Sequence, residues 1–249
     1  MNLFSDYKNN DNLPFLLPSK DGYSINWNDS LNGFNIKVPN GELFYAEEFF
    51  DKKISDRCVE YFLENNSIDT KITNWRDFDK EKLKSVEFKN ILWQHDKILM
   101  FGKEIYVPRY SAWYGDENKS YTYSGITFYA KKWNKGLLYI KEKIEKKLNL
   151  SFNSVLLNWY RDGEDHMGWH SDDEKELGKN PTIASVNFGE VRDFLLKSNK
   201  TNEKISIPLK HGSILIMSGQ LQHNWKHSIP KRKKRNNIRF NLTFRTIIN

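Results

Sequence analysis

A series of short strand-like segments lies between residues 155 and 247, with turn-forming residues between them. In the first segment apolar residues recur at every second position, as expected when successive side chains of a β-strand point to opposite faces. Many short strands with intervening turns are typical of jelly rolls and barrels. We therefore expect a mixed α+β, mainly β fold with a double-stranded β-helix (jelly-roll) core. The expected strands are 155–160, 181–188, 192–197, 204–209, 212–217, 225–229 and 238–247.

The chain length of 249 residues fits one large domain or at most two small ones. We expect a single catalytic domain over residues 1–249. It would consist of an N-terminal arm (1–40), with a short strand at 34–38, a region of helices and a lid (41–150), and the core (151–249). No internal repeat divides the chain.

Two bracing helices are expected before the core. Asp51 is a suitable N-cap for a helix that runs to about Asn65. A second segment, 133–149, has an apolar stripe at helical spacing with lysines and glutamates opposite. Cys58 falls on the apolar face of the first helix, so we interpret it as a core residue rather than a nucleophile.

A candidate metal site follows the strand expected at 155–160. Asp162-Gly163 supplies a turn, and the chain continues to His170-Ser171-Asp172. In extended backbone, residues i and i+2 point to the same side, roughly 6.6 Å apart, so His170 and Asp172 can bind one ion. With a distant histidine they match the facial triad of non-haem Fe(II) enzymes. Taken alone, a His-x-Asp pair is also common in polar loops.

The last strand-like segment carries two arginines on one face. Arg239, Asn241, Thr243 and Arg245 alternate with apolar residues that point to the other side. The face could be turned to water, or it could hold an anion inside a barrel, since arginine pairs with a carboxylate through two parallel hydrogen bonds. The two arginines lie roughly 20 Å apart along an extended strand. They could hold both ends of a small dicarboxylate only if the strand curves.

In combination, these motifs resemble the AlkB family of Fe(II)- and 2-oxoglutarate-dependent dioxygenases, most closely its DNA-repair members. The resemblance extends, with gaps, from about Leu92 to Ile247, which is well over half of the chain. The motifs that carry it are Asn158-x-Tyr160, His170-Ser-Asp-Asp-Glu174, Ile183 to Gly189, His211-Gly-Ser, His227 and Arg239 to Arg245.

The resemblance implies that His170, Asp172 and His227 hold Fe(II) and form the catalytic centre. It further implies a DNA repair demethylase that uses Fe(II), O2 and 2-oxoglutarate. The substrates would be N-alkylated bases such as 1-methyladenine and 3-methylcytosine, and the products formaldehyde, succinate and CO2. Extrusion of the base from the stack costs a few kcal/mol, and a lesion that blocks pairing lowers this cost.

The same resemblance assigns 2-oxoglutarate to a set of residues on two strands. Arg239 would pair with the far carboxylate, and Arg245 would lie near the end that chelates the metal. Asn158 and Tyr160, on one face of the first core strand, would donate hydrogen bonds to the co-substrate.

For the base pocket, the resemblance implies that Tyr123 and the His170 ring enclose the damaged base, with Tyr121 beside it. Stacking of a base on an aromatic ring is worth roughly 1–3 kcal/mol. Asp173 and Glu174 would face the base, and carboxylates suit the cationic methylated forms. Ordinary strand packing of the two tyrosines and a solvated loop for the two acids remain the alternatives.

Contacts with the DNA duplex are expected at two places. Phe101 matches a hydrophobic finger that wedges into the duplex in double-strand-repair relatives, although a core position in a strand is equally consistent with its sequence. Arg232, Lys233 and Lys234 belong to a run of five basic residues just after His227. We interpret this run as a phosphate-binding loop; a solvated loop and a nuclear-import signal are the alternatives.

Composition indicates the kind of partner and the cellular compartment to expect. The formal net charge of +7 favours a polyanionic partner, here alkylated DNA with RNA as the second choice. A single cysteine excludes an internal disulfide, and we find neither a secretory signal nor an apolar run long enough to cross a membrane. We expect an intracellular monomer, cytoplasmic in a bacterium or nuclear in a eukaryote. The alternatives are an RNA demethylase of the same chemistry and a metal-free nucleic-acid-binding module.

Overall fold

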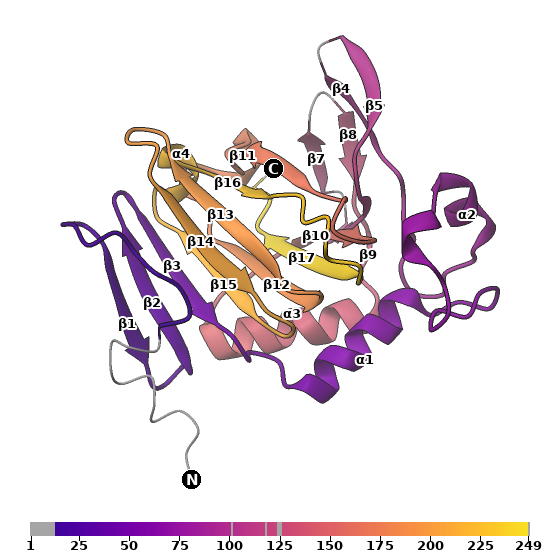
Figure 1. Ribbon diagram of the computed structural model, residues 1–249, viewed down its shortest axis with the longest axis horizontal. Helices are drawn as coiled ribbons and strands as arrows, with labels where there is room; N and C mark the ends of the chain where they lie inside the picture. The colour runs from indigo at the N-terminus through magenta and orange to yellow at the C-terminus, as the bar shows by residue number, and fades with distance from the viewer. Residues whose placement is uncertain (1–12, 101, 118, 124–125, 249) are drawn as a thin grey trace.

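The computed structural model describes residues 13–100, 102–117, 119–123 and 126–248, without the side chains of residues 99–100, 120–123 and 126–128. Two β-sheets pack face to face, and helices cover the outer side of the larger sheet (Figure 1). This arrangement is the mainly β fold with a jelly-roll core that the sequence predicts. The fold prediction is confirmed.

The large sheet has the strand order β1-β2-β3-β15-β12-β17-β10-β6-β9. Every neighbouring pair is antiparallel except β6 with β9. In that order the strands are Ser24–Asn28, Gly33–Val38, Gly41–Ala46, Ile214–Ser218, Ile183–Gly189, Arg239–Arg245, Ser154–Tyr160, Tyr110–Gly115 and Lys131–Lys132.

The small sheet has the order β11-β16-β13-β14, and its strands are Met167–His170, Trp225–Ile229, Arg192–Ser198 and Lys204–Leu209. Two separate hairpins stand beyond one end of the sheets (Figure 1): β4 (Lys97–Met100) with β5 (Lys103–Tyr106), and β7 (Ser120–Tyr123) with β8 (Ile126–Tyr129). The described helices are α1 (Lys52–Leu63), α2 (Lys80–Ser85), α3 (Lys135–Leu148) and α4 (Leu221–Asn224), with short 3-10 turns at Trp75–Asp77 (η3) and Lys175–Leu177 (η4).

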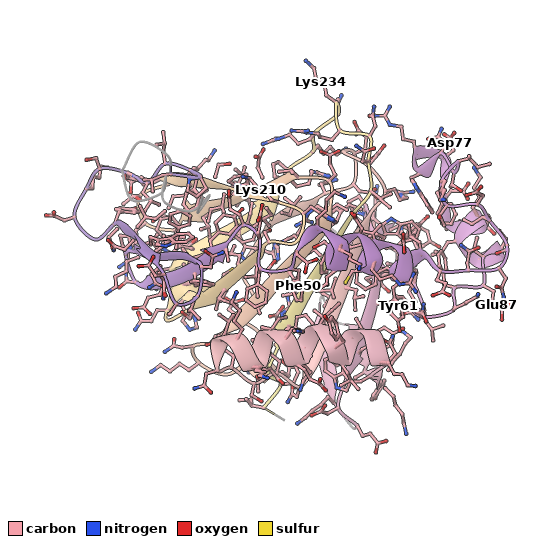
Figure 2. All side chains as sticks on the ribbon, turned by 90° about the horizontal axis from the view of Figure 1, so that it is seen from below. Phe50, Tyr61, Asp77, Glu87, Lys210 and Lys234 are labelled. Atoms are coloured by element: carbon pink, nitrogen blue, oxygen red, sulfur yellow. The ribbon has the colours of Figure 1, made fainter. Side chains whose placement is uncertain are left out.

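Helices α1 and α3 run side by side along the same side of the sheets (Figure 2). Their apolar faces share one core with the large sheet, in which Phe62 of α1 lies 5.2 Å from Phe240 of β17, ring centre to ring centre. Trp159 of β10 is fully buried in the same core. Cys58 is buried there as well, as the sequence predicts, and burial raises the pKa of its thiol to about 12.

The first bracing helix begins where the sequence places it, and the second begins at Lys135, two residues after the expected start at 133. The Asp51 carboxylate accepts a hydrogen bond from the Ile54 amide at 2.8 Å, so Asp51 is the N-cap of α1. Asn134 caps α3 in the same way. Helix α3 ends at Leu148, and its C-cap residue Asn149 has a φ of 54°, the left-handed conformation common after a last helical turn.

The polar face of β10 and β17 points between the two sheets rather than to water. Arg239 is 1% exposed and Arg245 is 7% exposed. The interpretation of this face as solvent-exposed is therefore wrong. The register pairs Tyr160 with Arg239 and Asn158 with Asn241, so the side chains of each pair lie on one face of the sheet.

The N-terminal region differs from a surface arm. The expected short strand is present as β2, but β1 and β3 flank it, and the three strands extend the large sheet. The buried apolar side chains of β2 are those of Phe34, Ile36 and Val38. Because the polar residues of this region sit at turns and on the outward side, the sequence shows too few apolar positions to reveal the pairing.

Candidate metal and co-substrate site

His170, Asp172 and His227 come together at the end of β11 and the middle of β16. Their candidate ligand atoms all lie within 4.8 Å of one another, so one ion can contact all three. Nε2 of each histidine lies 3.9 Å from an Asp172 carboxylate oxygen. Two imidazoles and one carboxylate are the ligand set of the facial triad that binds non-haem iron. No other group of this kind occurs among the described residues.

The surrounding structure holds each ligand in place. His170 and His227 are opposite one another in the β11–β16 pair, and their ring centres are 4.2 Å apart. Nδ1 of His170 donates to the Gly168 carbonyl at 2.9 Å, which directs the lone pair of Nε2 toward the cluster. The ring of Phe194 stacks on His227, with centres 5.0 Å apart and an angle of 22°.

The protonation states of the three candidate ligands favour metal binding. Burial lowers the pKa of His227 to about 3 and also lowers that of His170, so both rings are neutral and can offer a lone pair. Burial would raise the pKa of Asp172. The positive charge of Arg245 and its hydrogen bond to the carboxylate oppose that effect, and the pKa is lowered to about 2. Asp172 is therefore an ionised, negatively charged ligand at neutral pH.

The two arginines of β17 lie at different distances from this cluster. Arg245 donates to Oδ1 of Asp172 at 2.9 Å, next to the metal position. Arg239 lies beside the Tyr160 ring, 4.9 Å from its centre, and donates through Nη2 to Asn187 Oδ1 at 2.5 Å. Nε and Nη1 of Arg239 are buried without a hydrogen-bond partner among the described residues. Burial lowers the pKa of Arg239 to about 10, so the group stays charged at neutral pH.

A buried cation with two unused donors calls for an anion, because an uncompensated charge in the interior is costly. A dicarboxylate bound in this cavity would offer one carboxylate to the metal and the other to Arg239. Both arginines and the three metal ligands line the same cavity, which has about 1060 Å³ of empty space including its open mouth. The residues therefore suit Fe(II) together with a 2-oxo dicarboxylate.

Asn158 and Tyr160 also line this cavity, as expected. Arg109 also lines it, although it was not among the residues expected to bind the co-substrate. Nε of Arg109 donates to Oδ1 of Asn158 at 2.8 Å, which fixes the amide so that its NH2 group remains a donor. No periodic pattern identifies Arg109, because its partner is 49 positions away in the chain.

A second buried arginine was also missed. Arg192 of β13 is 2% exposed and donates to the carbonyls of Asp162, Asp165 and Pro230 at 2.6–3.0 Å. It thereby joins the loop after β10 to the loop after β16. Such a contact depends on three backbone positions and leaves no signature in the sequence.

The structure describes only some of the side chains that are expected to contact the base. Tyr121 and Tyr123 lie on β7, and their side chains are outside the described part of the structure. Asp173 is exposed, Glu174 is half-buried, and neither belongs to the cavity lining formed by the described residues. The role of these four residues in binding a base stays a prediction.

The DNA-contact residues are likewise placed in part. Phe101 lies outside the described residues. Lys233 and Lys234 are exposed, and Lys234 projects from the edge of the molecule opposite α3 (Figure 2). Arg232 instead folds back onto Asp193, with Nε 2.8 Å from Oδ2. Its charge is already paired in this structure.

Comparison with known proteins identifies the family to which the chain belongs. A sequence profile described as the 2OG-Fe(II) oxygenase superfamily matches residues 57–245. The chain belongs to this superfamily. The matched region contains all three candidate metal ligands and both arginines of β17.

Curated relatives refine this assignment. The human protein named DNA oxidative demethylase ALKBH2 is 42% identical over 160 residues, which cover 61% of each chain. The bovine alpha-ketoglutarate-dependent dioxygenase alkB homolog 3 is 43% identical over 150 residues, covering 56% of this chain and 52% of that protein. The Arabidopsis thaliana protein named ALKBH2 is 37% identical over 187 residues, covering 64% and 60%. The chain is a member of the AlkB family, and the matches span roughly three fifths of the first relative's length.

No described helix is long and apolar enough to cross a membrane.

Proposed function

We propose that this protein is an oxidative demethylase that removes methyl groups from N-alkylated bases in DNA. The observation that carries the proposal is the cavity in which the His-Asp-His cluster and the buried Arg239, with its two unused donors, face a common space. Relatives named DNA oxidative demethylase supply the reaction and substrate class. Alkylated DNA is therefore the proposed partner.

In this proposal, His170, Asp172 and His227 hold Fe(II), and Arg239 binds the far carboxylate of 2-oxoglutarate. With O2, the bound iron and 2-oxoglutarate supply the oxidation of the N-methyl group. The chain itself binds and orients the reactants. Arg245, at Asp172, adds positive charge beside the chelating carboxylate, and the NH2 group of Asn158 donates to the co-substrate.

The rest of the cavity excludes water from this chemistry. Met167, Leu209, Met217 and Ile229 contribute apolar side chains to its lining. Low polarity near the metal strengthens the pairing between the arginines and the co-substrate.

We also propose that the base is enclosed by Tyr123 and His170, with Tyr121, Asp173 and Glu174 beside it. Phe101 and the basic loop, chiefly Lys233 and Lys234, would contact the duplex. The protein would act as an intracellular monomer, in the cytoplasm of a bacterium or the nucleus of a eukaryote, where genomic DNA is found.

The direct test measures formaldehyde released from DNA that contains 3-methylcytosine, with Fe(II), 2-oxoglutarate and O2 present. We expect turnover by the wild type and none by Asp172→Asn. Matched DNA and RNA strands with the same lesion distinguish the substrates, and faster turnover of RNA would replace DNA in the proposal. Absence of turnover on both, by folded protein that still binds them, would contradict it.

A further inference from the structure

A second carboxylate lines the cavity that contains the candidate metal ligands. Among the described lining residues only Asp96 and Asp172 are acidic. Asp172 belongs to the metal cluster and pairs with Arg245. Asp173 and Glu174, the acids expected beside the base, do not belong to this lining. Asp96 is therefore the one carboxylate of the described lining that neither the metal nor the co-substrate uses.

Asp96 reaches the cavity from the segment that leads into the β4–β5 hairpin. Gln94, Asp96 and Ile98 are spaced two residues apart, and all three line the cavity, as expected where successive side chains alternate in direction. The intervening His95 points to the other side, where its ring centre lies 4.6 Å from that of Tyr106. This alternation directs the Asp96 carboxylate into the cavity.

Ser111 of β6 holds this carboxylate beside the co-substrate residues. Its hydroxyl donates to Oδ2 of Asp96, and its backbone pairs with that of Gln94. Ser111 is also directly opposite Asn158 in the pair of β10 with β6, so their Cβ atoms lie about 5 Å apart. Asn158 is the proposed hydrogen-bond donor to the co-substrate. Asp96 thus lies on the side of β10 opposite to β17 and its two arginines.

No ion pair involves Asp96 in the part of the chain that the structure describes. Its side chain has one hydrogen bond there, from the neutral hydroxyl of Ser111. Arg109 lines the same cavity, but its Nε donates to Asn158 instead. Asp96 is half-buried, and a carboxylate that leaves water needs several hydrogen bonds or an opposite charge. Its remaining acceptor sites therefore suit a donor group that carries positive charge.

The two ends of the cavity suit ligands of opposite charge. Arg239 and Arg245 suit the carboxylates of the co-substrate, whereas Asp96 suits a cation. Methylation of cytosine at N3 gives a cationic base whose amino group at C4 can donate a hydrogen bond. Thymine methylated at N3 is neutral and carries a carbonyl oxygen, an acceptor, at the same position. A carboxylate attracts the first base and repels the second.

We propose that Asp96 binds the positively charged methylated base, so that the site selects cationic lesions over neutral lesions of similar shape. The inference rests on the proposed function, because it takes a methylated base as the substrate in this cavity. It places the selecting carboxylate on the wall next to β6. Asp173 and Glu174, by contrast, directly follow the metal ligand Asp172 in the chain.

The test compares Asp96→Asn with the matched control Glu104→Gln. Each substitution removes one negative charge, and Glu104, in the adjoining hairpin, is exposed and outside the cavity lining. Each protein is assayed on otherwise identical DNA single strands that contain 3-methylcytosine or 3-methylthymine. Binding is measured without iron, and formaldehyde release is measured with Fe(II), 2-oxoglutarate and O2. The ratio of the values for the two lesions is the selectivity.

Asp96→Asn is expected to lower the selectivity for 3-methylcytosine about tenfold, both in binding and in kcat/KM, because it removes a hydrogen bond between charged groups. Turnover of 3-methylthymine should stay equal or rise, since the repulsion is removed. Glu104→Gln should keep the wild-type selectivity. An unchanged selectivity in Asp96→Asn, or an equal change in both variants, would overturn the proposal. A lower free energy of unfolding with unchanged selectivity would instead make Asp96 a structural partner of Ser111.

Failure of the demethylase proposal can be distinguished from failure of this inference. The wild type could release no formaldehyde and still bind 3-methylcytosine in preference to 3-methylthymine. Loss of that preference in Asp96→Asn would then support the role of Asp96 and contradict only the demethylase activity. If the wild type demethylated both lesions and Asp96→Asn kept the wild-type ratio, the demethylase proposal would stand and the role of Asp96 would be overturned.

Discussion

Replacement of Arg239 by methionine distinguishes an arginine that binds co-substrate from one that stabilises the fold. The side chain is 1% exposed, and its Nη2 donates to Asn187 Oδ1. That oxygen also accepts from Asn241 Nδ2 at 3.1 Å, so it keeps a partner when the guanidinium is removed. Methionine fills much of the same space with an unbranched apolar chain.

The expected loss of affinity follows from the two unused donors. Two charge-assisted hydrogen bonds to the far carboxylate of 2-oxoglutarate, at about 1.5 kcal/mol each, give about 3 kcal/mol. This corresponds to a dissociation constant about 100-fold higher in Arg239→Met. The free energy of unfolding without ligand should not fall, because the substitution removes a buried and incompletely paired charge.

Anaerobic calorimetric titration of the Fe(II) protein with 2-oxoglutarate measures the first effect, and urea unfolding of the ligand-free protein measures the second. The monocarboxylate 2-oxobutyrate is the control ligand, because it lacks the far carboxylate and should bind both proteins alike. If Arg239→Met bound 2-oxoglutarate normally and unfolded at lower urea, Arg239 would be a structural residue and our reasoning would be refuted.

Three other predictions concern the loops and helices around the site. Gly163→Ala would place a Cβ 1.9 Å from the Arg232 carbonyl oxygen. We therefore expect the substitution to lower the free energy of unfolding, measured in urea, by about 1–3 kcal/mol. An unchanged urea midpoint would be inconsistent with this close contact. Asp51→Ala should cost about 1 kcal/mol by removing the hydrogen bond to Ile54, whereas Asp51→Asn should retain most of the stability. Burial raises the pKa of Cys58 to about 12, so its thiol should resist iodoacetamide at pH 8 until the protein unfolds. The free energy of unfolding should decline as pH rises above the unfolded thiol pKa of about 8.5, because the unfolded chain then loses the proton first. Rapid alkylation of the folded protein would show that the thiol is accessible.

The strands of the core could be predicted because their side chains alternate between two different environments. In β10, Trp159 packs under the helices while Tyr160 faces the cavity, and this difference in polarity is visible in the sequence. The helix starts were also predictable, because the Asp51 cap acts within four residues. Strand β1 was missed because it gains its stability from pairing with β2, a contact that polar strand residues do not reveal.

In the site, too, some residues could be predicted from the local sequence and others could not. His170 and Asp172 are two residues apart, so local geometry predicts that they can share an ion. By contrast, Arg109 reaches the site through Asn158, and Arg192 acts through three backbone carbonyls of distant loops. Only the folded chain brings these partners together. The pairing of Arg232 with Asp193 was missed for the same reason, since a run of basic residues does not show which of its charges are neutralised.

Anaerobic titration with Fe(II) of the wild type and Asp172→Asn tests the central claim most directly. The asparagine keeps the size of the side chain and an oxygen that can accept from Arg245, but it removes the negative charge that binds the metal. We predict one tight Fe(II) site per chain in the wild type and a large loss of affinity in the variant. Because the variant also leaves Arg245 without its buried counter-charge, its unfolding free energy without metal should fall, so the titration is carried out where the variant is still folded. Equal Fe(II) affinity in the two proteins would contradict the assignment of His170, Asp172 and His227 as the metal ligands.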